Sequence, residues 1–133
     1  MPTMMQASIL TKSPAYAVLP AEDLERARKF YHDVLGFDVD EYPQMQQFII
    51  KAGEGSRILV YERSRTTAQH TAVSFIVDKL DKTMEDLSAR GVTFEEYDMP
   101  GLKTQGGVAR MPEGIAAWFT DPEGNIINIT EMR

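Results

Sequence analysis

Two side chains near the end of the chain, Trp118 and Asn128, are the best suited to hold a ligand. The segment 121–125, Asp-Pro-Glu-Gly-Asn, has the order of a type I turn followed by a one-residue glycine bulge. This turn sets the strand register and pairs Trp118 with Asn128. Strand residues alternate between faces, so both lie opposite the face of Phe119 and Ile127. An indole can stack on a ring and an amide can donate and accept hydrogen bonds, which suits a small organic ligand.

Few other residues offer chemistry. The chain has two histidines, His32 and His70, and no cysteine, which excludes disulfides and thiolate catalysis. We find no glycine-rich phosphate loop, no nucleophile with its base and no close carboxylate pair that suggests acid–base catalysis. His32 is expected to face water from a helix.

Composition narrows the class of protein. The 133 residues suffice for one compact domain, and a net charge of -6 disfavours nucleic acid, which needs clustered cations. The acidic surface could favour a cationic ligand, although solubility explains it more simply. No apolar run approaches the ~20 residues that cross a bilayer, so no membrane association is expected. The start of the chain lacks a signal-peptide pattern, and we expect a cytoplasmic protein.

An internal repeat organises the elements that position these side chains. Amphipathic helices are predicted over 24–37 and 80–92, capped by Asp23 and Asp78 and ended by glycine. Strand-like runs precede and follow each helix, so each half reads as β-α-β-β-β. The predicted strands are 16–19, 37–41, 47–51, 57–62, 72–77, 93–97, 114–120 and 125–130.

These motifs resemble those of the vicinal oxygen chelate superfamily, which includes glyoxalase I, bleomycin resistance proteins and extradiol dioxygenases. Residues 20–37 are similar to its first-module signature, and Phe75-x-Val77, Ala-Arg-Gly-Val over 89–92 and the 121–125 turn are similar to its second. The resemblance implies an α+β fold of tandem βαβββ modules that form a curved mixed sheet.

In these terms residues 1–133 form a single domain, with module 1 at about 14–62, a linker at 63–69 and module 2 at about 70–131. The resemblance also implies a homodimer. The aromatic residues Tyr42, Phe48 and Tyr61 are candidates for an exposed surface that a partner chain would cover.

Enzymes of this superfamily usually hold a divalent metal in the cup of the curved sheets. The resemblance puts the ligand positions at Tyr16, Ala72, Asn128 and in the strand 57–62. Alanine offers no donor, an amide is weak for such an ion, and a phenol would have to ionise. No cofactor or divalent metal is therefore expected.

A different metal site could still use His70, Glu62 and Glu131. The simpler alternative is that His70 lies in the linker and that both carboxylates are solvated strand ends.

The predicted ligand-binding residues therefore line the cup of the curved sheets, without a metal. Its lining would be Tyr16, Ala72, Ser74, Trp118 and Asn128. The long connection 97–107 could act as a lid, with Met111 among the apolar residues that close the mouth of the cup and Lys103 as the nearest positive charge. Alternatively Trp118 fills the cup, Asn128 links two strands and the connection is a plain crossover.

Three functions remain open from the sequence. The first is a metal-free protein of the glyoxalase/bleomycin-resistance type that binds a small organic molecule. The second is a metal-dependent or metal-free lyase, isomerase or dioxygenase, with Tyr16 as a possible acid or base. The third is an interaction module whose cup is packed shut. We expect the first, with catalysis undecided.

Overall fold

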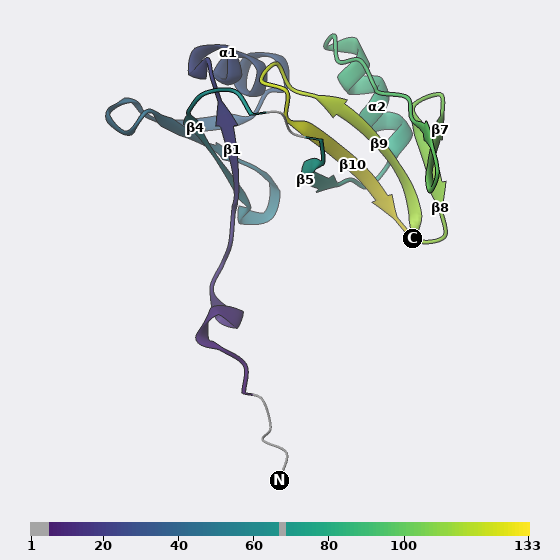
Figure 1. The fold of residues 1–133 in the computed structure, drawn as a ribbon, viewed down its shortest axis with the longest axis horizontal. Coiled ribbons are helices and arrows are strands. Elements are labelled where there is room, and N and C mark those ends of the chain that lie inside the picture. The colour runs from purple at the N-terminus through teal and green to yellow at the C-terminus, as the bar shows by residue number, and fades with distance from the viewer. Residues whose placement is uncertain (1–5, 67–68) are drawn as a thin grey trace.

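The computed structural model describes residues 6–66 and 69–133 as two modules that lie side by side, each with a helix against one face of a curved sheet (Figure 1). Module 1 consists of β1 (Ala17–Ala21), α1 (Leu24–Arg28), a π-helical segment (Lys29–Val34), β2 (Asp38–Tyr42), β3 (Gln47–Lys51) and β4 (Arg57–Glu62). Module 2 consists of β5 (Thr71–Ile76), α2 (Leu80–Ala89), β6 (Asp98–Met99), β7 (Leu102–Gln105), β8 (Val108–Met111), β9 (Gly114–Thr120) and β10 (Ile126–Met132).

The two sheets repeat one topology. Their strand orders are β1-β4-β3-β2 and β5-β10-β9-β8-β7-β6, and in each the first strand runs parallel to the last strand of its module. Shorter 3-10 turns lie at Ile9–Lys12, Pro43–Met45 and Gly53–Gly55. The predicted fold class is confirmed. Part of the predicted linker, residues 67–68, lies outside the described residues.

The first helix begins as predicted. The Asp23 carboxylate accepts a hydrogen bond from the amide of Arg26, and Gly36 ends the segment with a φ of 82°. The prediction of one α-helix over 24–37 is wrong in part, because the helix widens to a π-helix after Arg28. In this wider turn Phe30 and Tyr31 both pack with the core.

The second helix begins differently from the prediction. Its N-cap is Lys79, which makes no side-chain cap, and the Glu131 carboxylate accepts the hydrogen bond from the amide of Leu80 at 2.7 Å. The predicted cap by Asp78 is therefore wrong. The helix ends near Gly91, whose φ is 92°, as predicted.

The core lies between the helices and the sheets and includes residues of both modules. Phe37 stacks on Phe75 with ring centroids 5.7 Å apart, and Phe30 lies 6.4 Å from Phe119. Phe48, predicted to be exposed, is 1% exposed and belongs to this core. Tyr42, which was also predicted to be exposed, is exposed.

The hairpin of β9 and β10 has the predicted register. Thr120 pairs with Ile126, Phe119 with Ile127 and Trp118 with Asn128. The turn closes with a hydrogen bond from the amide of Gly124 to the carbonyl of Asp121, and Gly124 has a φ of 88°.

The segment before β9 differs most from the prediction. The predicted strand 93–97 is reduced to a bridge between Phe94 and Phe119, and the predicted lid at 97–107 is mostly sheet. Gly106 and Gly107 form the two-residue turn between β7 and β8, and both have positive φ. A turn of this kind favours glycine, because glycine adopts positive φ without steric cost. No helix in the described parts of the chain is long and apolar enough to span a membrane.

Candidate functional site

Strand pairing brings three of the predicted site residues into one row. Asn128 lies opposite Ser74 of β5 on one side and opposite Trp118 of β9 on the other. The residues on either side of Asn128, Ile127 and Ile129, are buried in the core under the helices, so the row faces away from the helices. We call Ser74, Asn128 and Trp118 the module 2 row.

Module 1 has the equivalent row. Leu59 of β4 lies opposite Val18 of β1 and opposite Ile49 of β3. We call these three residues the module 1 row. The positions match those of the module 2 row in sheet order, but all three side chains are aliphatic.

Two residues that the sequence did not predict hold Trp118 in place. The indole N–H donates a hydrogen bond to the Thr71 hydroxyl at 3.1 Å. The Tyr97 ring packs against the indole at right angles, with centroids 5.6 Å apart. Burial, and then the charge of Glu95, raises the pKa of the Tyr97 phenol, so it stays protonated at neutral pH. Trp118 itself remains partly exposed, so its indole is both fixed and accessible.

Asn128 is used mainly within the sheet. It is 5% exposed, its amide N–H donates to the carbonyl of Ala117 at 3.3 Å, and its amide oxygen accepts from the Thr130 hydroxyl. These contacts support the alternative that Asn128 links strands. Ser74, the third member of the row, is exposed.

The other predicted site residues are more scattered. Tyr16 immediately precedes β1 in module 1 and is 58% exposed. Ala72 lies at the bulge where the pairing of β5 with β10 shifts. Met111 pairs with Gly114, on the Trp118 face of β9. Lys103 is exposed in β7 and lines a separate open pocket of about 450 Å³ with Arg110.

The residues at the family's metal positions do not fit a divalent cation. Ala72 has no donor atom, and the module 1 row offers only the aliphatic Leu59 at the position equivalent to Asn128. The amide oxygen of Asn128 already accepts a hydrogen bond. Within residues 6–66 and 69–133, no group of three or more His, Asp or Glu side chains is arranged to hold a metal.

The alternative metal ligands point elsewhere. Glu62 lies opposite the buried Ala21, on the helix face of module 1, and Glu131 caps α2. His70 is exposed just before β5. The expectation that Glu131 is a solvated strand end is therefore wrong, because its carboxylate is bound to the helix.

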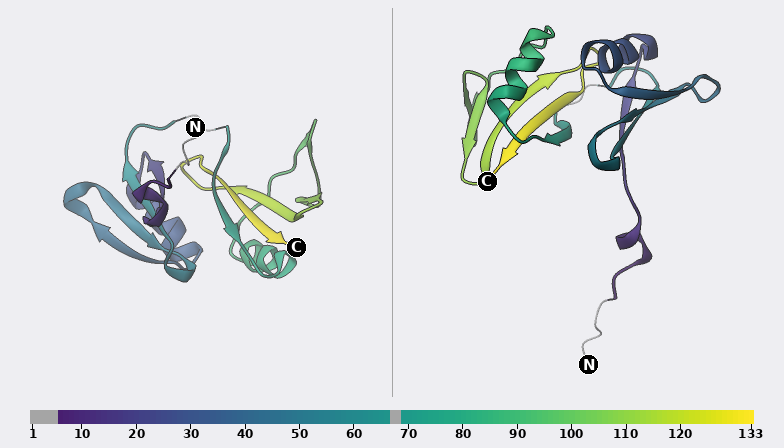
Figure 2. Two further views of the ribbon diagram at one scale, coloured as in Figure 1. Left: turned by 90° about the horizontal axis from the view of Figure 1, so that it is seen from below. Right: turned by 180° about the vertical axis from the view of Figure 1, so that it is seen from behind.

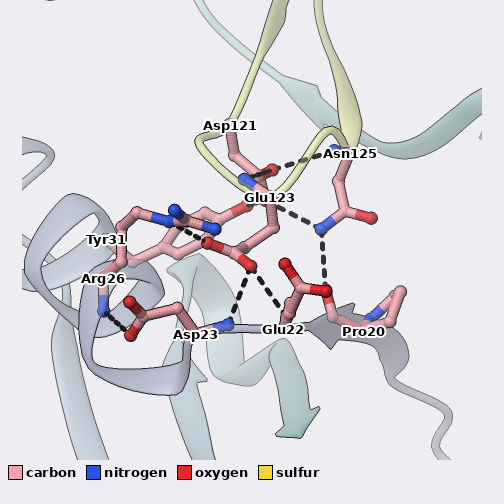
Figure 3. Close-up of polar contacts among 8 residues, drawn as sticks. All are labelled: Pro20, Glu22, Asp23, Arg26, Tyr31, Asp121, Glu123 and Asn125. Atoms are coloured by element: carbon pink, nitrogen blue, oxygen red, sulfur yellow. Dashed lines mark hydrogen bonds and ion pairs between the residues drawn. The ribbon is translucent and has the colours of Figure 1, made fainter. Parts of the chain in front are cut away.

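The turn between β9 and β10 also joins the two modules (Figure 3). The Glu123 carboxylate accepts hydrogen bonds from the amides of Glu22 and Asp23 at 2.7 and 3.1 Å and pairs with Arg26 at 2.6 Å. Burial raises the pKa of Glu123, but the Arg26 contact and the two amides outweigh it, and the pKa ends below its ordinary value. A carboxylate of module 2 thus binds the two amides that lead into the helix of module 1, beside its Asp23 cap.

Asp121 and Asn125 complete this connection. The Asp121 carboxylate accepts hydrogen bonds from the Tyr31 hydroxyl at 2.5 Å and from the amides of Glu123 and Asn125. The Asn125 side chain donates to Asp121 and to the carbonyl of Pro20. Burial, and then the Asp121 charge, raises the pKa of Tyr31. The sequence indicated only a turn here.

Comparison with known proteins identifies the family. A model of the Glyoxalase/Bleomycin resistance protein/Dioxygenase superfamily matches residues 13–129. No curated protein sequence matches the chain significantly.

Three solved structures illustrate the similarity in fold. TnmS3, an antibiotic binding protein from Streptomyces sp. CB03234, has a TM-score of 0.68 at 21% identity, over 92% of this chain and 98% of its own. A lactoylglutathione lyase from Agrobacterium tumefaciens gives 0.66 at 21%, over 90% and 93%. The fosfomycin resistance protein FosX from Listeria monocytogenes gives 0.67 at 15%, over 92% and 94%.

At these identities the structures show the fold alone, whereas the family model matches most of the chain. The resemblance found in the motifs is thereby confirmed. The chain belongs to the Glyoxalase/Bleomycin resistance protein/Dioxygenase superfamily.

Proposed function

We propose that the protein binds a small organic molecule against Trp118 on the face of module 2, without a catalytic metal. The observation that carries this proposal is the indole of Trp118, which Thr71 and Tyr97 hold in one orientation while it stays accessible. A fixed aromatic face gives stacking energy at little cost in side-chain entropy.

The residues around Trp118 indicate a planar or aromatic ligand. Ser74 adds an exposed hydroxyl at the other end of the row, two strands away from Trp118. One similar structure is that of an antibiotic binding protein, which supports a drug-like ligand. We further propose that the protein is a homodimer, as its family resemblance implies, and that it is cytoplasmic, which its lack of cysteines suits.

The test uses the only tryptophan of the chain. Its fluorescence comes from Trp118 alone, so ring stacking there quenches it directly. We would titrate the protein with planar polycyclic antibiotics and, as a non-aromatic comparison, with fosfomycin. Saturable quenching by a planar compound, confirmed by calorimetry, would support the proposal. Calorimetric binding that leaves the fluorescence unchanged would place the ligand elsewhere.

Metal independence is tested separately. We expect elemental analysis of protein purified without a metal-affinity tag to find no stoichiometric metal. We also expect titration with Zn²⁺, Ni²⁺, Mn²⁺ and Fe²⁺ to show no tight site, because the family's positions lack suitable donors. One tightly held ion per chain would contradict this and favour a lyase or dioxygenase.

A further inference from the structure

The segment before β1 is ordered locally but covers nothing. Residues 9–12 form a 3-10 turn whose first amides are satisfied by Ser8, through its side chain and its carbonyl. Every residue from 6 to 16 is exposed, and Ile9 and Leu10 are 85% and 73% exposed. We call residues 6–16 the N-terminal arm. Two neighbouring large aliphatic side chains on a capped turn are typical of a segment that docks.

The arm does not reach its own modules. It leaves the start of β1 and runs away from both sheets, which is visible from the front and from behind (Figures 1 and 2). The hydrogen bonds described for it lie within the arm itself. Residues 13–16 alone span about 12 Å when extended, so they carry the turn beyond the end of the sheet.

A groove between the two modules has the matching character. It has a volume of about 830 Å³ and lies between the Gly53–Gly55 turn and the ends of β5 and β10. Its apolar lining includes Ile76 and Met132, which are 75% and 57% exposed. These two side chains are among the most exposed large apolar groups of the domain.

Charge complements this apolar match. Glu54 and Asp78 also line the groove, and the arm carries Lys12 two residues after Leu10. With Leu10 on the apolar part, Lys12 would lie within reach of an acidic group at the edge.

We infer that the N-terminal arm of one copy docks in this groove of a second copy, with Ile9 and Leu10 against Ile76 and Met132. The inference rests on the proposed homodimer. Because Ser74 lines the same groove, the docked arm would border the module 2 row and the partner would help to enclose the ligand.

Crosslinking tests the contact, since the natural chain has no cysteine. We would mix full-length chains that carry Leu10→Cys with chains that carry Ile76→Cys and treat them with a short bismaleimide. Each chain has one cysteine, so any Leu10–Ile76 crosslink joins two copies. Peptide mass spectrometry is expected to find it in high yield. The matched control replaces Ile76→Cys with Met45→Cys, at another exposed apolar site, 64% exposed.

Light scattering of the unmodified protein separates the possible failures. If the protein is a dimer but the yield of the Leu10–Ile76 crosslink does not exceed that of the Met45 control, the docking of the arm is refuted. The homodimer is then unaffected. A monomer would refute both the docked arm and the homodimer. The Trp118 titration would still test ligand binding, because it does not depend on dimerisation. A chain with both cysteines that crosslinks only within itself would place the arm on its own groove and also refute the inference.

Point variants then measure the contribution to dimerisation. Ile9→Asp with Leu10→Asp is expected to weaken the dimer about tenfold or more, because two apolar side chains would no longer be buried. Lys12→Glu should weaken it less, and adding Glu54→Lys should restore part of the loss. An unchanged dissociation constant in the first variant would contradict the docked arm.

Discussion

The two modules share one topology but differ at equivalent positions of their outer faces. The module 1 row is Val18, Leu59 and Ile49, and the module 2 row is Ser74, Asn128 and Trp118. The repeat therefore supplies the same scaffold twice, and at these three positions only the second copy carries hydrogen-bonding and aromatic groups. A ligand site is indicated by this departure from the repeat more than by the fold itself.

The helix starts differ in a parallel way. Glu131 caps α2 within module 2, but Glu62, at the equivalent end of β4, is exposed. Asp23 caps α1, and Glu123 of module 2 binds the amides of Glu22 and Asp23 just before it. The helix start of module 1 thus receives an additional carboxylate from module 2, while the helix start of module 2 is completed from within.

The largest effect is expected from Asp121→Ala, which removes the buried contact of the turn with Tyr31 of module 1. It leaves the buried Tyr31 hydroxyl and two turn amides without their acceptor, and should cost about 3–5 kcal/mol of unfolding free energy. Urea denaturation measures this. Pro122→Ala in the same turn is the control and should cost less than about 1 kcal/mol. Equal losses in both variants would assign the effect to turn geometry.

Replacing three glutamates compares the helix starts directly. Glu123→Ala should cost about 2–3 kcal/mol, because two amides and Arg26 lose a buried partner. Glu131→Ala should cost about 1 kcal/mol, since one amide loses its cap, and Glu62→Ala should stay within about 0.5 kcal/mol. If Glu62→Ala costs as much as Glu123→Ala, the asymmetry between the modules is wrong.

The contribution of Glu123 should depend on pH. The pKa of Glu123 lies below its ordinary value of 4.5, so the ionised form is favoured by folding. The contribution is complete above about pH 4.5 and is lost as pH falls through the folded pKa. The stability difference between wild type and Glu123→Gln should therefore shrink between pH 7 and pH 3 in urea titrations. A difference that grows on acidification would contradict the lowered pKa.

Variants in the module 1 row and the module 2 row can be compared by their affinity for a ligand. Trp118→Ala should weaken binding of a planar compound found in the fluorescence titration by about 1–3 kcal/mol in calorimetry. Ile49→Ala, at the equivalent position of module 1, should change it by less than about 0.5 kcal/mol. Equal losses at both positions would mean that the ligand uses both modules.

The smallest effect is expected from Thr71→Val. This variant removes the acceptor of the indole N–H and keeps the size of the side chain. Binding should weaken by less than about 1 kcal/mol, and the emission of Trp118 should shift in wavelength as the indole loses its hydrogen bond. An unchanged spectrum would show that Thr71 does not position Trp118.

Local signals predicted much of this fold. The register of β9 and β10 followed from the 121–125 turn alone, and Asp23 and Gly36 marked the ends of the first helical segment. The sequence analysis predicted a lid or a plain crossover over 97–107 and no β7–β8 hairpin, although the Gly106-Gly107 pair is a hairpin signal.

Distant partners could not be predicted in this way. The cap on Leu80 comes from Glu131, 51 residues later, and Glu123 meets Glu22 across 101 residues. The residues next to Asp78 do not indicate that Glu131 binds the start of the second helix in its place. Those next to Glu123 do not indicate its contact with Glu22. Thr71 and Tyr97 were missed for the same reason, since they reach Trp118 only through the sheet bulge and the irregular segment before β6.

The contact of Glu123 with Glu22 and Asp23 also bears on the order of events during synthesis. The start of the first helix leaves the ribosome about 100 residues before the turn whose Glu123 binds it. Contacts so far apart in the chain slow folding, and domains synthesised first normally fold first. Here Asp23 can cap the first helix at once, but the Glu123 contact beside that cap forms only when nearly the whole chain has emerged.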